Sequence, residues 1–205
     1  MLDHVVLAAP DLGRAVAQFA DRTGLVPAPG GSHPGLGTAN YLVALGPNAY
    51  LELIGPDPDQ PRPAPDRPFL VDRLPAPRIV TWAIRTADID AAVTDARRRG
   101  YDPGAPRAMS RATPTGEVLR WRLTPPRPEV DDGLVPFLID WGATAHPAGR
   151  RLPSVGLVGL RATHPDPDAI QPRLRALDAA LPVDAGPRAA LILTIETPRG
   201  VQVLS

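Results

Sequence analysis

The sequence of 205 residues contains no cysteine and no lysine, so all 22 of its basic residues are arginine. Without cysteine the chain cannot form disulfides, thiolate metal sites or a cysteine nucleophile. Its formal net charge is zero, so it lacks the electrostatic field that attracts nucleic acid or anionic membranes. It also lacks a signal peptide and any apolar run near the roughly 20 residues that span a bilayer. We therefore expect a cytoplasmic protein with neither nucleic acid nor membrane as a partner.

Two common catalytic motifs are absent as well. The glycines at 30, 31, 35 and 37 have neither the spacing nor the following helix of a dinucleotide fingerprint or a phosphate-binding loop. The chain has no G-x-S-x-G nucleophile elbow, which argues against a serine hydrolase. The sequence thus predicts no nucleotide cofactor.

What the chain does contain is a strand and helix pattern that occurs twice and, in weaker form, a third time. Strands are expected at 4–8, 79–84 and 156–160. The first two are followed by apolar residues at helical spacing, with Asp11 and Asp88 as N-caps and Gly24 and Gly100 as stops. The third helix is expected over 170–181, with Asp166 or Asp168 as its cap.

Further strand candidates follow each helix. They are 39–45 and 49–54, then 118–123 and 135–139, and finally 190–196 and 201–204. The order predicts an α+β fold of repeated strand, helix and antiparallel strand units. We place a first unit at 1–56, a proline-rich connection at 57–77, a second unit at 78–145 and a partial third βαββ unit at 153–205.

The best candidate site is formed by His4, His33 and Glu52. Strand alternation places Glu52 on the face of Tyr50 and Ile54, and a carboxylate in an apolar strand is costly unless it is paired or bound to a cation. Imidazole and carboxylate are typical ligands of a divalent metal. His33 lies in a turn-rich segment and is a third ligand or a general base. In the alternative interpretation His4 caps a strand, His33 is solvated and Glu52 pairs with an arginine.

Several segments together resemble the glyoxalase-like domain family of the vicinal oxygen chelate (glyoxalase/bleomycin resistance/dioxygenase) superfamily. They are His-Val-Val at 4–6, Pro-Asp-Leu at 10–12, residues 30–40, Tyr-Leu-Glu-Leu-Ile at 50–54, Ser110–Arg111, Gly116, Trp121 and residues 136–142. The resemblance covers about two-thirds of the chain and implies paired βαβββ modules that form a curved mixed sheet around a cleft. The superfamily commonly holds a metal on the first and last strands of each module, which implies His4 and Glu52 as ligands.

The second module departs from that pattern. Thr81 or Trp82 stands where the first module has His4, and no carboxylate precedes Asp140 in the last strand. His33, Asp140 or His146 would have to complete the ligand set.

Arg111 and Trp121 are candidates for holding a substrate carboxylate, by a forked hydrogen bond and an aromatic wall. Tyr50 and Asn40 are further substrate-binding candidates. The alternative is an exposed arginine and a core tryptophan.

Three functions remain open from the sequence. The first is a small-molecule enzyme in which zinc, nickel, manganese or iron polarises vicinal oxygens of a substrate, with lyase, isomerase or dioxygenase chemistry and with Glu52 and His33 as catalytic residues. The second is a metal-free protein that binds a small ligand between Trp82, Trp121 and Tyr50. The third is a structural or dimerising scaffold, since related modules also pair between chains. A homodimer therefore remains one of the open alternatives.

Overall fold

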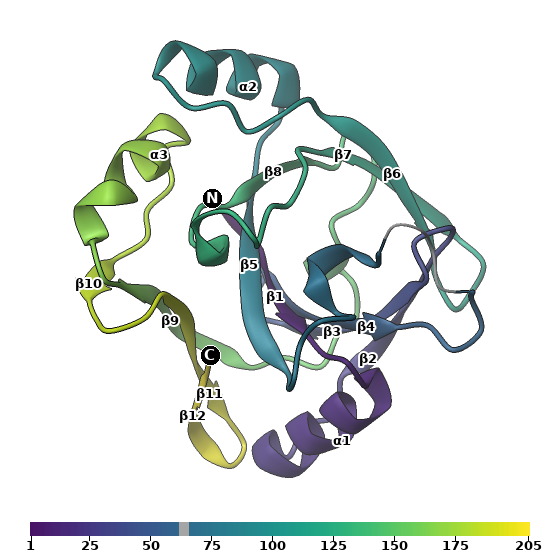
Figure 1. Ribbon diagram of the computed structural model, residues 1–205. Coiled ribbons are helices and arrows are strands. Elements are labelled where there is room, and N and C mark those ends of the chain that lie inside the picture. The colour runs from purple at the N-terminus through teal and green to yellow at the C-terminus, as the bar shows by residue number, and fades with distance from the viewer. Residues whose placement is uncertain (62–65) are drawn as a thin grey trace.

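Two sheets make up the fold of this chain. The structure is a computed structural model that describes residues 1–61 and 66–205. Eight strands close into a barrel in the order β1-β4-β3-β2-β6-β7-β8-β5, and a second sheet has the order β10-β9-β11-β12 (Figure 1). The expected α+β fold with a curved sheet is confirmed.

The first half of the barrel is a βαβββ module. Its elements are β1 (Leu2–Ala8), α1 (Leu12–Thr23), β2 (Ala28–His33), β3 (Thr38–Ala44) and β4 (Tyr50–Pro56). The Asp11 side chain accepts a hydrogen bond from the Arg14 amide and so begins α1, and Gly24, at φ 75°, ends it in the left-handed region. Both ends of this helix were predicted from the sequence.

The second half repeats the module. It contains β5 (Arg78–Arg85), α2 (Ile89–Arg98), β6 (Arg107–Ala112), β7 (Val118–Leu123) and β8 (Phe137–Asp140). The strand orders 1-4-3-2 and 5-8-7-6 are equivalent, and the barrel closes where β1 pairs antiparallel with β5 and where β2 meets β6. The β2 and β6 seam consists of a single register pair, Ser32 with Ala112.

Alternation along the strands divides the barrel side chains between an inner and an outer layer. On β4, Tyr50 and Ile54 pack with the inner cluster, whereas Leu51 and Leu53 belong to the outer one. Glu52 therefore faces the barrel interior, as its position in the strand predicted.

The third unit consists of β9 (Gly156–His164), α3 (Gln171–Ala176), β10 (Val183–Ala185), β11 (Ala190–Thr197) and β12 (Gly200–Leu204), with a short 3-10 helix, η4, at Pro167–Ala169. The helix predicted over 170–181 is present as α3, but its predicted cap and length are wrong. Neither Asp166 nor Asp168 caps α3, since both belong to the η4 turn. The helix is also shorter than predicted, because Asp178 adopts φ 50° and the chain leaves the helical path before Leu181.

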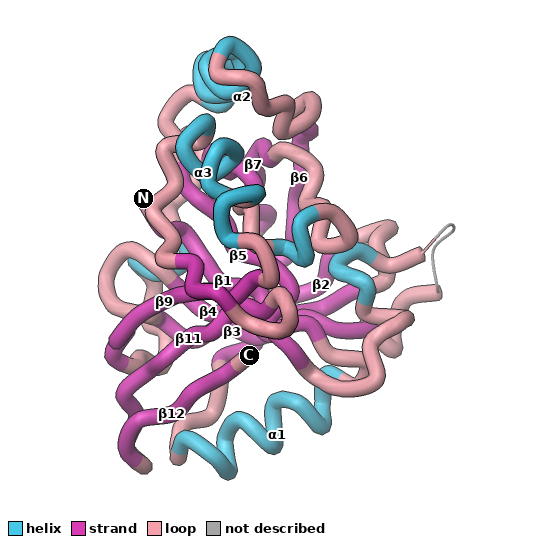
Figure 2. The backbone as a smooth tube through the Cα atoms, turned by 60° about the vertical axis from the view of Figure 1, so that its left-hand side comes forward, coloured by secondary structure: helices cyan, strands magenta, loops and turns pink. Residues whose placement is uncertain are grey.

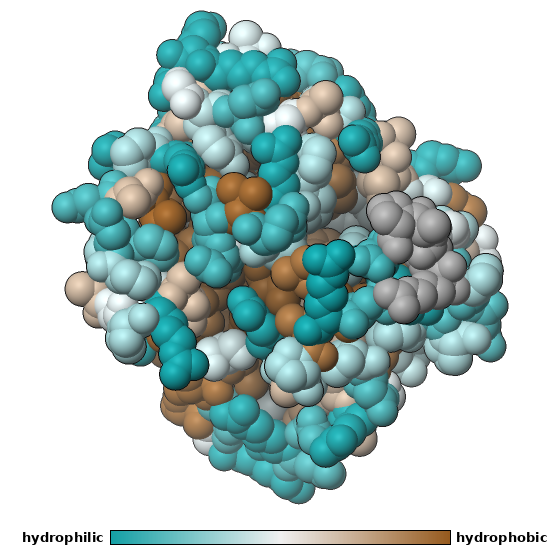
Figure 3. All heavy atoms as spheres, in the orientation of Figure 1, coloured by the Kyte–Doolittle hydropathy of each residue, from teal (hydrophilic) through white to brown (hydrophobic). Residues whose placement is uncertain are grey.

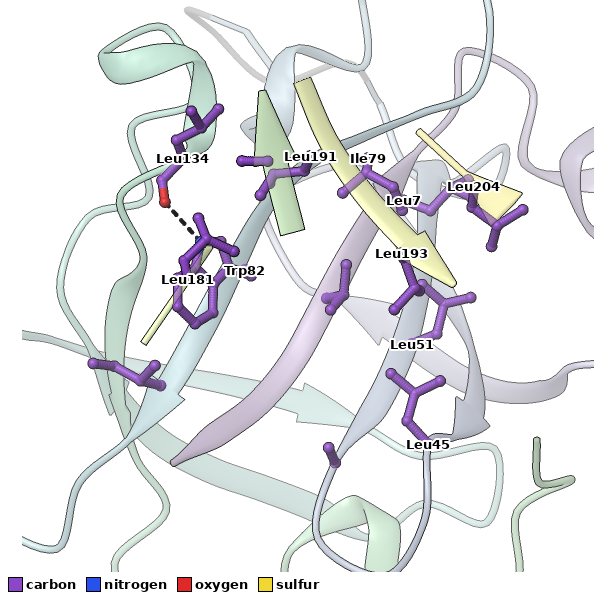
Figure 4. Packing of buried hydrophobic residues seen from close by; sticks show 14 of the residues in the cluster. Leu7, Leu45, Leu51, Ile79, Trp82, Leu134, Leu181, Leu191, Leu193 and Leu204 are labelled. Carbon is purple, nitrogen blue, oxygen red and sulfur yellow. Dashed lines mark hydrogen bonds between the residues drawn. The ribbon is translucent and has the colours of Figure 1, made fainter. Parts of the chain in front are cut away.

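Leucines of β11 attach this second sheet to the outside of the barrel. Leu191 and Leu193 lie in one apolar cluster with Leu7, Leu51 and Ile79 of the barrel strands (Figure 4). In Figure 2, α1 runs along the lower side of the molecule below β12. The third unit thus buries the outer barrel surface and leaves the interior to the two modules.

The connections carry three more 3-10 turns, η1 (Pro68–Leu70), η2 (Asp131–Gly133) and η3 (Pro147–Gly149). Residues 62–65 of the expected proline-rich connection lie outside the described residues. In Figure 1 the chain around η1 lies in front of the barrel interior. Among the helices of the described residues, none has the length and apolar character needed to cross a membrane.

Candidate functional site

A cleft of about 290 Å³ occupies the barrel interior. Seven of the barrel strands contribute side chains to it, and Phe69 of η1 contributes one more. The lining includes His4, His33, Asn40, Tyr50, Glu52, Phe69, Met109, Arg111, Trp121, Phe137, Ile139 and Trp141. Apolar side chains at the centre of the face seen in Figure 3 are surrounded by hydrophilic ones. The cleft is therefore an apolar chamber with a small polar group on one wall.

That polar group is centred on Glu52. Nε2 of His4 lies 3.8 Å from Oε2 of Glu52, and Nε2 of His33 lies 4.0 Å from Oε1. All three side chains are buried, at 4%, 6% and 6% exposure for His4, His33 and Glu52. The structure thus brings together the three residues that the sequence singled out.

Asp3 orients His4 from the side away from Glu52. Its Oδ1 lies 2.6 Å from Nδ1 of His4, and its Oδ2 lies 3.0 Å from both Nε1 of Trp141 and Nε2 of His146. Burial by itself would raise the pKa of Asp3, but the hydrogen bonds from His146 and His4 outweigh burial and hold this pKa well below its usual range. Asp3 is therefore a fully buried carboxylate that stays ionised.

His33 is the last residue of β2 and not a solvated loop residue. Its Nδ1 lies 3.1 Å from Oγ1 of Thr38 at the start of β3. Burial lowers the pKa of His33, and the nearby Glu52 carboxylate opposes that shift only in part. This imidazole is consequently neutral at physiological pH and has a nitrogen that can accept a proton or bind a cation.

Asn40 joins Glu52 to Arg111. Nδ2 of Asn40 donates to Oε1 of Glu52 at 2.5 Å, and Nη1 of Arg111 donates to Oδ1 of Asn40 at 2.6 Å. Arg111 is 4% exposed, and burial lowers its pKa, although Tyr50 and Glu52 act in the opposite direction. Glu52 therefore pairs with an arginine only through an amide, and the alternative interpretation of Arg111 as an exposed side chain is wrong.

Aromatic rings complete the walls. Tyr50 stacks on His4 with centroids 4.8 Å apart and planes 14° apart, and burial raises the pKa of its hydroxyl well above the usual value. The ring centroids of Trp121 and Trp141 lie 5.2 Å apart, and Trp121 faces the cleft. Trp82 does not line the cleft: it packs in the outer core, where its Nε1 donates to the carbonyl of Leu134 (Figure 4).

The second module contributes no acidic or imidazole ligand to the cleft. On β8 the side chains that line the cleft are Phe137 and Ile139, and the Asp140 carboxylate instead accepts the Gly142 amide outside the cleft. His146 reaches Asp3 and so takes part in the site indirectly. The sequence had placed His146 in a connecting segment and had offered it, with Asp140, as a residue that could complete the ligand set.

The imidazole nitrogens and the carboxylate oxygens are atoms that bind divalent metals, but the distances between them are longer than in a metal site. Within residues 1–61 and 66–205, no group of three or more histidine, aspartate or glutamate side chains is arranged to hold a metal ion. Ligand atoms on one ion at about 2.1 Å lie roughly 3 to 3.5 Å apart, and the two distances to Glu52 exceed that by about half an ångström. Two imidazoles and one carboxylate are nevertheless a standard ligand set.

Sequence reasoning missed Asp3 and the aromatic wall of Phe69 and Phe137. Asp3 was hard to recognise, because alternation places it on the face opposite to His4 and its partner His146 lies 143 residues further along the chain. The one available hint was a carboxylate at the start of a strand that is otherwise apolar.

Comparison with known proteins fits this architecture. Residues 2–177 match the model of a family described as glyoxalase-like domain. The chain therefore belongs to the glyoxalase-like domain family, within the vicinal oxygen chelate superfamily that its sequence resembles. No curated protein sequence matches it.

One solved structure has the same fold along the whole chain, and others match part of it less well. A hypothetical protein from Staphylococcus aureus is 14% identical with a TM-score of 0.67, over 100% of this chain and 98% of that one. A methylmalonyl-CoA epimerase from Mycobacterium tuberculosis is 25% identical with a TM-score of 0.44, over 68% and 86%. A Streptomyces coelicolor methylmalonyl-CoA epimerase in complex with 2-nitronate-propionyl-CoA is 20% identical with a TM-score of 0.45, over 72% and 98%. Below a TM-score of 0.5, these epimerases decide nothing about the chemistry of this chain.

Proposed function

We propose that this protein is an enzyme that acts on a small organic acid and uses a divalent metal held by His4, His33 and Glu52. The observation that carries the proposal is the direction of the donor atoms. The Nε2 atoms of both imidazoles face the same carboxylate, at 3.8 and 4.0 Å, inside a chamber that is otherwise mainly apolar. Binding would require these side chains to approach one another by about half an ångström.

The ligand set would leave positions open for two neighbouring oxygens of a substrate. A metal bound there supplies a Lewis acid that stabilises an enolate-like or oxyanionic state, as lyase, isomerase and dioxygenase reactions of vicinal oxygens all require. Zinc, nickel, manganese and iron all accept imidazole with carboxylate.

The chain's own residues have separate tasks in this proposal. Arg111 holds the substrate carboxylate, because its guanidinium is buried with an amide and not a carboxylate as its partner. Trp121 forms the wall beside it. Glu52 would move a proton at the reacting carbon, whereas the neutral His33 would serve as a ligand with the metal and as the base only in a cleft without one. The Tyr50 hydroxyl, which keeps its proton, donates a hydrogen bond to the developing oxyanion.

A metal-free binding protein is the second candidate. The distances to Glu52, longer than those between ligands of one ion, favour it. In that case the same cleft sequesters a small acid on Arg111 and Trp121, and Glu52 is a hydrogen-bond acceptor.

The deciding experiment is metal analysis by mass spectrometry on untagged protein, before and after incubation with each of the four metals. We expect close to one ion per chain in the wild type and loss of that ion in His4→Ala and Glu52→Ala. His164→Ala is the matched control, because His164 lies outside the cleft and bonds Asp166. An ion that persists in both cleft variants, or no ion in the wild type under any condition, would reject the metal enzyme and leave the binding protein.

A further inference from the structure

We propose that Asp3 is a positioning residue that fixes the tautomer of His4, and that the segment directly after β8 supplies the two donors, Trp141 and His146, that hold Asp3 in place. The consequence for metal binding rests on the proposed function above. The tautomer itself does not.

The hydrogen atoms around Asp3 follow from the chemistry of its neighbours. The indole Nε1 of Trp141 can only donate. Nδ1 of His146 accepts the amide hydrogen of Ala148 at 3.2 Å, so in the neutral ring the proton is on Nε2, and Nε2 donates to Oδ2 of Asp3. Asp3 has no exposed surface and three nitrogen partners, an environment that stabilises its carboxylate form. A carboxylate only accepts, so Nδ1 of His4 must also carry a proton and donate to Oδ1.

The remaining nitrogen of His4 is therefore the one that faces the cleft. In the neutral ring with its proton on Nδ1, the lone pair of Nε2 points toward Glu52, as a metal ligand or a proton acceptor requires. The opposite tautomer would place a hydrogen there and exclude a cation. Asp3 decides between these two forms, since it is the hydrogen-bond partner of Nδ1.

This arrangement also gives the second module a role. Its strands place no carboxylate or imidazole in the cleft, but the chain just after β8 carries both Trp141 and His146. A carboxylate with no exposed surface needs such donors, because an unpaired buried charge is strongly destabilising. In our interpretation, the first module presents the proposed ligand atoms, and the segment after β8 orients one of them.

The test reads the tautomers directly, from long-range ¹H–¹⁵N correlation spectra of the ¹⁵N-labelled full chain. In the wild type we expect His4 with its proton on Nδ1 and His146 with its proton on Nε2. In Asp3→Asn the new amide can donate to Nδ1 of His4, so we expect His4 to shift to the Nε2–H form. Asp140→Asn is the matched control, because that side chain accepts only the Gly142 amide and should leave His4 unchanged.

Zinc titration of the same proteins measures the consequence. We expect zinc affinity to fall about 10- to 100-fold in Asp3→Asn and to stay unchanged in Asp140→Asn. A wild-type His4 protonated on Nε2, or an unchanged tautomer in folded Asp3→Asn, would overturn the inference. Equal zinc affinity of that variant and a wild type that does bind zinc would overturn its consequence for metal binding. If Asp3→Asn does not fold, the wild-type spectrum alone decides. Expected tautomers in a wild type that binds no metal would support the inference and reject the metal proposal.

Discussion

Nη1 of Arg111, on β6 of the second module, lies 2.6 Å from Oδ1 of Asn40, on β3 of the first. The two residues are 71 positions apart, and the bond crosses the barrel next to the seam between β2 and β6. Because the same Asn40 amide donates to Glu52, this contact fixes both the cation and the carboxylate of the cleft. The shape of the polar site therefore depends on how the two modules meet.

Arg111→Met should weaken the binding of small acids. A hydrogen bond to a charged group contributes about 2 kcal/mol, so we expect roughly 30-fold weaker binding of any 2-oxo acid that the wild type binds. Isothermal titration with pyruvate and phenylpyruvate, each compared with its methyl ester, measures this. Arg120→Met is the control, since Arg120 is exposed and does not line the cleft. Equal loss in both variants would show a general charge effect and contradict a binding role of Arg111.

Asn40→Ala should lower the free energy of unfolding by about 2 kcal/mol. The substitution leaves the buried Glu52 and Arg111 groups without their amide partner, and unsatisfied buried polar groups are costly. Urea denaturation measures the change, and Asn48→Ala, at an exposed position, should cost far less. A variant as stable as Asn48→Ala would mean that the two charged groups find other partners.

The pH dependence of stability should contain a contribution from His33. Its pKa in the folded state lies below the ordinary value of 6.5, so the unfolded chain binds a proton more readily. Stability from this group is then complete above about pH 6.5 and is lost as the pH falls toward the folded-state pKa. The urea midpoint of the wild type should decrease as the pH is lowered from 8 to 5, and the decrease should be smaller for His33→Gln. Equal slopes would show that His33 titrates normally.

Alanine substitutions at two glycines separate the cost of disturbing the barrel seam from the cost of a positive φ alone. Gly31 has φ 132°, and a Cβ there would overlap with the carbonyl of Ala112 across the seam. We expect Gly31→Ala to cost about 3 kcal/mol or more. Gly35→Ala also places alanine at positive φ, 76°, but meets no atom within 4 Å, so about 1 kcal/mol is expected. Thermal unfolding measures the stability of both variants. Equal losses of stability would mean that the strands at the seam move apart at little cost.

The amino-acid sequence predicted α1 and α2 well, because caps and helical spacing act over a few residues. It failed for β2, where two glycines and a proline resemble a turn, although the segment pairs with β3 along its length. It also failed for α3, whose apolar spacing continues to Leu181 while the backbone leaves the helix near Asp178. Local composition cannot report strand pairing or a residue held at positive φ by its surroundings.

For the site, the sequence by itself determined which face of β4 carries Glu52, since alternation in a strand is a local property. It also identified His4 and His33 as candidate ligands. Only the tertiary structure decided that Asp3 binds His146, that Arg111 reaches Asn40 and that Trp82 lies outside the cleft. These outcomes depend on the register with which two modules close one barrel, and that register is set by contacts between residues far apart in the chain.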